Sequence, residues 1–170
     1  GGVIAYPTEA VWGLGCDPFN ETAVKHLLKI KRRPMHKGLI LVASSLQQVE
    51  PLLANLTSEQ RARVTASWPG PVTWILPDPD DLIPSWIKGN HPSVAVRVSD
   101  HYLVKELCEE FGSMIVSTSA NYSDRCPARD RLKVSIHFKS VVSTIVPGKL
   151  GQLSRPTQIF TLGNDQPVRI

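Results

Sequence analysis

The stretch KIKRRPMHKGLIL, residues 29–41, places five basic side chains between a predicted helix and a predicted buried strand. Asn20 is a favourable helix cap, and apolar residues recur at helical spacing over residues 23–28. The helix should end near Arg33, because Pro34 disfavours helical geometry in the residue before it. The unbroken apolar run of residues 39–43 then predicts a buried strand. This stretch therefore indicates a helix, a basic turn and a strand, the building unit of an α/β fold.

Strand and helix patterns alternate along the rest of the chain. Further helices are predicted after Ser45, after Thr57, which forms a capping-box pattern with Gln60, and after Asp100. Further strands are predicted at residues 3–6 and 72–76 and in the segments SVAVRVSD, MIVSTSAN, STIVPG and TQIFTL. The later strands crowd together with little between them. The pattern favours an α/β fold in one domain, residues 1–170, with an open twisted mixed sheet and helices packed on it.

Composition narrows the class of protein. The chain has 170 residues, of which 42% are hydrophobic and 20% are charged, and no run approaches the ~20 apolar residues that span a bilayer. The three cysteines are odd in number and far apart, which argues against a disulfide framework and indicates a cytoplasmic protein without membrane partners. Cys16 and Cys108 are interpreted as packing residues, and Cys126 as an exposed thiol. The net charge of +4 favours anionic partners.

Polar side chains stand at the ends of several predicted strands. Thr8 follows the first strand, the basic turn precedes the strand at 39–43, and STSAN, which contains Ser117, ends another strand. Arg97 lies inside a strand of apolar residues, where a charge is costly unless an anion meets it. Because ligands of open α/β sheets bind at strand ends, these groups could form one pocket for a triphosphate and a small carboxylate. Taken singly, each could instead stabilise a turn, cap a loop or form a surface ion pair.

Six motifs in one order resemble a known family over nearly the whole chain. They read YPTEAVWGLG, KIKRRPMHKGLIL, WPGPVTWIL, SVAVRVSDH, STSAN and VPG. The combination resembles the YrdC-like family of threonylcarbamoyl-AMP synthases, in its single-domain bacterial form. The resemblance implies a twisted α/β sheet with a basic concave face, and an N-terminal helix that is missing from this chain. It also implies a nucleotidyltransferase that forms threonylcarbamoyl-adenylate and pyrophosphate from L-threonine, bicarbonate and ATP, for threonylcarbamoyl-adenosine modification of tRNA.

The resemblance assigns expected roles to residues of this chain. The family's K-x-R and S-x-N signature falls on Lys31, Arg33, Ser119 and Asn121. Lys31 and Arg33 are expected to be catalytic, as cations that disperse phosphate charge. The expected ATP-binding residues are Arg33, Lys37, Ser93, Ser119, Asn121, Arg155 and Thr157, and the expected threonine-binding residues are Thr8, Arg97 and Ser117. Mg²⁺ is expected to accompany ATP, with Asp17 and Asp124 as unsupported candidate neighbours. His36 and His91 are interpreted as surface-loop residues rather than bases.

Two departures and two alternatives accompany this interpretation. The segment NYSDRCPARD replaces the family's Leu-Ser-Gly continuation, and Ala10 stands where many relatives have a threonine. One alternative is a nonenzymatic module that binds double-stranded RNA, tRNA or rRNA through Lys29 and Arg32. The other is a carbamoyl-adenylate-forming domain of the hydrogenase-maturation type, which normally sits inside a much larger chain. A synthase is further expected to supply a downstream threonylcarbamoyl-transferase complex.

Overall fold

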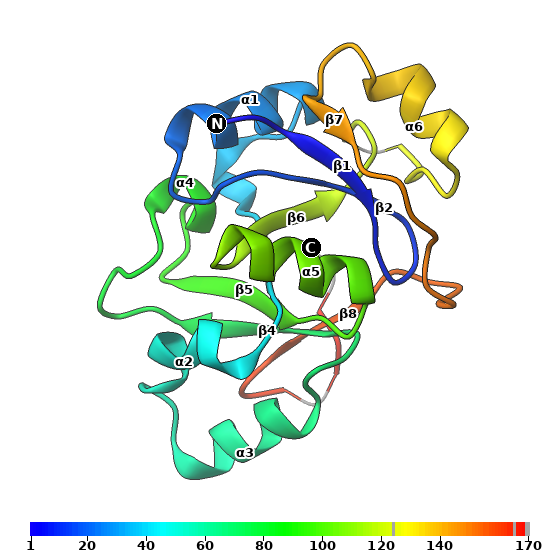
Figure 1. The fold of residues 1–170 in the computed structure, drawn as a ribbon. Coiled ribbons are helices and arrows are strands. Elements are labelled where there is room, and N and C mark those ends of the chain that lie inside the picture. The colour runs from blue at the N-terminus through cyan, green and yellow to red at the C-terminus, as the bar shows by residue number, and fades with distance from the viewer. Residues whose placement is uncertain (124, 165, 169–170) are drawn as a thin grey trace.

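A computed structural model of the protein, which describes residues 1–123, 125–164 and 166–168, forms one twisted sheet with helices packed on it (Figure 1). The sheet has eight strands in the order β7-β1-β2-β6-β3-β5-β4-β8, with parallel and antiparallel neighbours, as predicted. The strands are β1 (Ile4–Pro7), β2 (Trp12–Gly15), β3 (Ile40–Ala43), β4 (Val72–Pro77), β5 (Ser93–Val98), β6 (Ile115–Ser119), β7 (Thr144–Ile145) and β8 (Gln158–Thr161). The helices are α1 (Glu21–Lys31), the 3₁₀ turn η1 (Met35–Lys37), α2 (Leu46–Leu53), α3 (Ser58–Ala66), α4 (Ser85–Lys88), α5 (Tyr102–Phe111) and α6 (Arg131–Phe138).

Local signals at helix ends were read correctly in α1, α2 and α3 and incorrectly in α5. The Asn20 side chain accepts a 3.0 Å hydrogen bond from the backbone of Ala23, and α1 ends at a left-handed Arg32 just before Pro34. Thr57 forms the predicted capping box at the start of α3. Asp100 does not cap α5, because the chain remains extended for one further residue and the cap position falls on the next. Strand β2 and helices α4 and α6 were not predicted.

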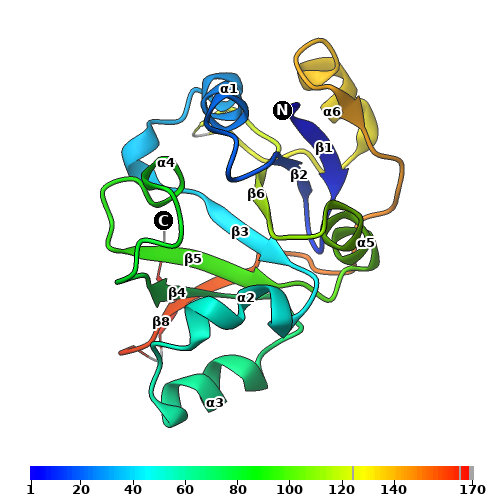
Figure 2. The same ribbon diagram turned by 60° about the vertical axis from the view of Figure 1, so that its left-hand side comes forward.

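The two faces of the sheet are covered unequally. Along β3, Leu41 and Ala43 belong to the large core on one face, whereas Val42 belongs to a smaller core on the other face. Helix α5 covers that smaller core with side chains that include the fully buried Val104 and Cys108 (Figure 2). Because side chains alternate along a strand, Ile40, two positions before Val42, lies on the same face of the sheet. It lines a cavity instead of packing in the core under α5. This uncovered end of the face becomes the floor of the cavity described below.

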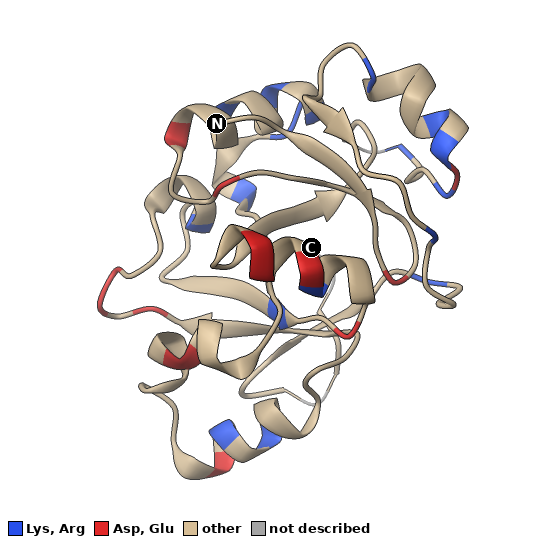
Figure 3. Cartoon of the chain, in the orientation of Figure 1, with Lys and Arg blue, Asp and Glu red and all other residues tan. Residues whose placement is uncertain are grey.

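Helix lengths and thiols complete the description. No helix in the described part of the chain is long and apolar enough to cross a membrane. Cys16 and Cys108 are buried and Cys126 is exposed, as predicted. Burial raises the pKa of the Cys16 thiol to about 12, which leaves it unreactive at neutral pH. Basic residues mark α1 and α6 and acidic residues mark α5 (Figure 3), and the basic concave face stays a prediction.

Candidate active site

A cavity of about 520 Å³ opens next to α5, on the part of that sheet face that the helix leaves uncovered. Its floor is formed by Ile40 of β3 and by two residues that lie directly opposite it, Ala95 of β5 and Ser117 of β6. Ile75 of β4, opposite Ala95, extends the floor. Eight of the residues predicted to form the site line this cavity: Thr8, Arg33, Lys37, Ser93, Arg97, Ser117, Ser119 and Thr157.

The cavity has two chemically different ends. Ser93 and Arg97 lie four residues apart on β5, a separation of about 13 Å along an extended strand. Arg33 and Lys37 come from the turn that leads into β3, which runs parallel to β5 with Ile40 opposite Ala95. The Arg33 and Lys37 side chains therefore enter beside the Ser93 half of the strand. Arg97 belongs to the opposite end, together with hydroxyl side chains.

Lys31 joins the two halves of the K-x-R and S-x-N signature. Its ammonium is buried and donates hydrogen bonds to the carbonyl oxygen of Ser119 and to the carbonyl and side-chain oxygens of Asn121, the latter two at 3.0 and 3.1 Å. The Ser119 hydroxyl in turn donates to the Asn121 side-chain oxygen at 2.5 Å. Burial, reinforced by the charge of Arg33, lowers the pKa of Lys31 to about 7. Lys31 does not line the cavity; it anchors the end of β6 that does.

The basic turn is fixed by close backbone packing against α4. Arg33 donates from Nε and Nη2 to the carbonyl oxygen of Gly38 at 3.1 and 3.0 Å. Gly38 has φ +64°, and a Cβ atom there would lie 2.9 Å from the carbonyl oxygen of Lys88. Gly89 has φ +67°, and a Cβ atom would lie 2.5 Å from the carbonyl oxygen of His36. Only glycine fits both positions, so the turn and α4 hold each other in register.

Lys88 is a cavity-lining cation that the sequence analysis missed. Its buried ammonium forms ion pairs with Asp78 at 2.9 Å and Asp81 at 2.5 Å. Hydrogen bonds to these carboxylates raise the pKa of Lys88. Burial alone would raise the pKa of Asp78, but hydrogen bonds from Lys88 and two backbone amides outweigh it and lower that pKa. The acidic run DPDD, residues 78–81, was the only sequence signal for this cluster.

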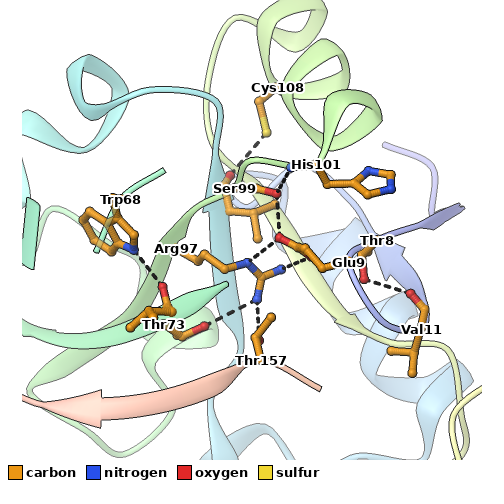
Figure 4. Close-up of polar contacts among 12 residues, drawn as sticks. Thr8, Glu9, Val11, Trp68, Thr73, Arg97, Ser99, His101, Cys108 and Thr157 are labelled. Atoms are coloured by element: carbon orange, nitrogen blue, oxygen red, sulfur yellow. Dashed lines mark hydrogen bonds and ion pairs between the residues drawn. The ribbon is translucent and has the colours of Figure 1, made fainter. Parts of the chain in front are cut away.

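Arg97 is buried and meets the anion that its position in an apolar strand required (Figure 4). That anion is Glu9, which the sequence analysis passed over. Arg97 also donates from Nη1 to the hydroxyl oxygens of Thr157 at 2.8 Å and Thr73 at 3.4 Å. Burial alone would raise the pKa of Glu9, but the Arg97 guanidinium and a hydrogen bond from Ser99 hold that pKa below its usual value. The glutamate of the YPTEA motif was visible in the sequence, but nothing local identified its partner 88 residues away.

The remaining predicted residues lie outside the cavity. Asn121 does not line the cavity, but its side-chain oxygen accepts a hydrogen bond from Ser119, which does. Arg155 is exposed, two residues before Thr157 in the chain, and does not line the cavity. Lys29 and Arg32 are exposed at the end of α1, where the Arg32 guanidinium lies 5.2 Å from the Tyr122 ring centroid. By contrast, the exposed side chain of His91 lines the cavity, whereas His36 does not.

The described residues of the site do not form a set of protein ligands for a metal ion. Among residues 1–123, 125–164 and 166–168, no three His, Cys, Asp or Glu side chains are grouped to hold one. The Asp17 carboxylate accepts a 2.8 Å hydrogen bond from the backbone of Phe19, and Asp124 lies outside the described residues. These residues do not fit a resident Mg²⁺ site.

Comparisons with known proteins agree with the geometry. A family model described as "Telomere recombination", for Sua5, YciO and YrdC proteins, matches residues 1–170. A Marinobacter nauticus protein named threonylcarbamoyl-AMP synthase is 50% identical, with 99% of this chain and 89% of that protein covered. A Pseudomonas aeruginosa protein of the same name is 51% identical, with 99% and 90% covered.

A crystal structure of P. abyssi Sua5 complexed with L-threonine superposes on the fold with a TM-score of 0.88 at 30% identity. The match covers 98% of this chain and 48% of the P. abyssi chain, so this chain spans about half of that protein. The shared sheet is therefore the part of the two proteins that can be compared. From the full-length family match and from relatives of about 50% identity, this chain belongs to the Sua5/YciO/YrdC family.

Proposed function

We propose that the chain is a threonylcarbamoyl-AMP synthase, a nucleotidyltransferase that converts L-threonine, bicarbonate and ATP into threonylcarbamoyl-adenylate and pyrophosphate. The observation that carries this proposal is that eight predicted site residues line one and the same cavity, in a chain about 50% identical to proteins of that name. The product would serve threonylcarbamoyl-adenosine formation in tRNA through a downstream transferase complex.

The chemistry requires positioning more than covalent catalysis. The threonine amine captures bicarbonate as a carbamate and releases water, and a carbamate oxygen then attacks the α-phosphorus of ATP as pyrophosphate leaves in line. Arg33 and Lys37 would disperse the negative charge of the phosphates as it moves onto pyrophosphate. Arg97, with Thr8 and Ser117, would hold the amino-acid end so that its carbamate points along the cavity toward the nucleotide. No side chain needs to become a nucleophile.

Two roles expected from the sequence change in this proposal. Lys31 acts as a positioning residue for Ser119 and Asn121 rather than as a phosphate ligand, because its three hydrogen bonds go to those residues. Mg²⁺ would enter with ATP, held by phosphate oxygens and water as is usual for this ion with nucleotides. It would supply charge neutralisation on the phosphates, and no protein carboxylate is assigned to it.

The test is pyrophosphate release from ATP and Mg²⁺, measured with and without bicarbonate and with threonine, serine or no amino acid. The synthase proposal expects release that requires both threonine and bicarbonate. Release independent of the amino acid would indicate a simple ATP hydrolase. No release from folded protein would refute the proposal and point to the segment NYSDRCPARD, which departs from the family.

A second candidate function, direct RNA binding, is favoured by one observation. Lys29 and Arg32 are exposed outside the cavity, at the end of α1, and Lys25 is exposed one turn earlier. Such a basic face can contact phosphates without sequence preference, so RNA affinity should fall steeply as salt rises. A complex insensitive to salt would exclude this mode. A relative named threonylcarbamoyl-AMP synthase, of which the match covers 89%, favours the synthase over the hydrogenase-maturation alternative.

A further inference from the structure

Glu9 sits in the turn between β1 and β2 in a position that none of the roles above uses. Its neighbours Thr8 and Ala10 line the cavity, but Glu9 does not, and it is buried. The turn is held from within, because the Thr8 amide and hydroxyl both donate to the carbonyl oxygen of Val11, at 3.2 and 2.8 Å. The backbone of Leu153 donates to the Glu9 carbonyl oxygen at 3.1 Å from the outer side. Glu9 therefore presents its carboxylate from a fixed backbone.

The carboxylate approaches one side of the Arg97 guanidinium (Figure 4). Glu9 Oε2 accepts a hydrogen bond from Nη2 at 3.3 Å, and Oε1 lies 3.2 Å from Nε in an ion pair that is too poorly aligned to be a hydrogen bond. The Ser99 hydroxyl donates to Oε1 at 2.7 Å and fixes the carboxylate in turn. The opposite nitrogen, Nη1, is already directed to Thr157 and Thr73.

These contacts leave the guanidinium little freedom. Two of its three nitrogens face Glu9 and the third faces threonine hydroxyls, so an N–H edge of Nη2 is left for a ligand in the cavity. A guanidinium without Glu9 would still be buried and charged, and it would rotate to find another acceptor. A buried ion pair contributes little net stability compared with apolar residues of the same volume, so fixing a geometry is the better reason for its presence.

We propose that Glu9 is a positioning residue that clamps Arg97 from behind the cavity, so that one fixed N–H edge is presented to the carboxylate of the amino-acid substrate. This inference rests on the proposed function and deepens it. The consequence is selective: Glu9 governs affinity at the amino-acid end and leaves the nucleotide end, built by Arg33 and Lys37, unaffected.

Three variants test the clamp. Glu9→Gln keeps the size and removes the charge. Ser99→Ala removes the hydroxyl that orients the carboxylate and that also accepts a 3.1 Å hydrogen bond from the His101 backbone. Glu110→Gln, an exposed glutamate of α5, is the matched control. We expect Glu9→Gln to raise the KM for threonine about tenfold or more, with kcat and the KM for ATP changed less than about twofold. Ser99→Ala should show a smaller change of the same kind, and the control none.

An orthogonal readout keeps the test independent of turnover. The Arg97 Nε–H makes no hydrogen bond, but it is buried against the Glu9 carboxylate. In ¹⁵N spectra of the wild-type protein it should therefore exchange slowly, because the clamped guanidinium keeps water away from it; its signal is assigned by its loss in Arg97→Lys. Glu9→Gln should accelerate that exchange at least about tenfold at unchanged far-ultraviolet circular dichroism.

The possible results separate cleanly. Selective loss of threonine affinity together with faster Nε–H exchange supports the clamp. A lower melting temperature with unchanged KM for threonine overturns it and leaves a structural ion pair. If the wild-type protein shows no threonine-dependent turnover, the proposed function fails, and the exchange measurement still decides whether Glu9 holds Arg97; unchanged exchange overturns the clamp.

Discussion

Replacing Lys31 by methionine tests whether the buried ammonium exists for stability or for placement of the S-x-N segment. The change keeps the unbranched stem and removes the charged group that donates to three oxygens of Ser119 and Asn121. Two energies oppose each other here. Charged hydrogen bonds stabilise by about 1.5–3 kcal/mol each, whereas burial of the ammonium costs several kcal/mol. We therefore expect a change of less than about 2 kcal/mol in unfolding free energy at pH 7.

The pH dependence gives the sharper number. The pKa of Lys31 is about 7 in the folded protein, whereas in the unfolded chain it is ~10.4. Between these values the unfolded chain binds more protons, so stability rises with pH. From pH 6 to pH 9 this one group should stabilise the wild-type protein by roughly 2–3 kcal/mol relative to Lys31→Met, at 1.36 kcal/mol per pH unit above ~7.

Urea unfolding followed by tryptophan fluorescence at pH 6 and pH 9 measures the difference. Lys29→Met, an exposed lysine of the same helix, is the control and should parallel the wild-type protein. Pyrophosphate release by Lys31→Met should fall at least about tenfold, because Ser119 loses its anchor. Parallel stability profiles for wild type and Lys31→Met would refute the reasoning, since they would mean that the three oxygens keep the ammonium charged despite its burial.

Three further predictions follow from other contacts. Arg33→Ala should reduce pyrophosphate release more than about 100-fold and RNA affinity less than about threefold. Arg32→Ala should reduce RNA affinity more than it reduces pyrophosphate release. Equal losses in the two assays would contradict these roles. Asp78→Asn should cost about 1–3 kcal/mol at pH 7, because it weakens a buried charged hydrogen bond while Asp81 still pairs with Lys88. Because the pKa of Asp78 is lower in the folded protein than its ordinary value of ~4, ionised Asp78 stabilises the fold above pH ~4, and this contribution is lost as pH falls. The melting temperature should therefore fall less steeply from pH 5 to pH 2 in the variant than in the wild-type protein. Equal slopes would argue against the pair. Gly89→Ala should lower stability by about 1–3 kcal/mol and raise the KM for ATP more than that for threonine. Gly163→Ala, where a Cβ meets nothing within 4 Å, is its control, and equal effects would contradict the packing argument.

Features encoded by neighbouring residues could be predicted from the sequence. The cap at Asn20 and the box at Thr57 involve groups three residues apart, so spacing alone identified them. The mixed sheet followed from the alternation of patterns. Strand β2 was missed, because its sequence WGLG contains two glycines and no alternation of apolar with polar residues; it is a strand through pairing with β1 and β6.

Site residues were identified more readily than their partners. The family signature marked Lys31, Ser119 and Asn121, but it gave no sign that the lysine binds the other two rather than a phosphate. Apolar neighbours showed that Arg97 needed an anion, yet Glu9 is 88 residues away and looks like any turn glutamate. Long-range pairing of charges depends on sheet order, which no local pattern contains.

The order of strands also has a consequence for synthesis of the protein on the ribosome. The cavity is lined by residues that extend from Thr8, just after β1, to Ile159 in β8, so its walls come from nearly the full length of the chain. Closing such distant segments is slow compared with forming local turns and helices. A nascent chain that has emerged only as far as β6 lacks β8 and the Thr157 hydroxyl that accepts from Arg97. The binding site is therefore among the last parts of the molecule to form, and an incomplete chain can fold much of its sheet without acquiring the capacity to consume ATP.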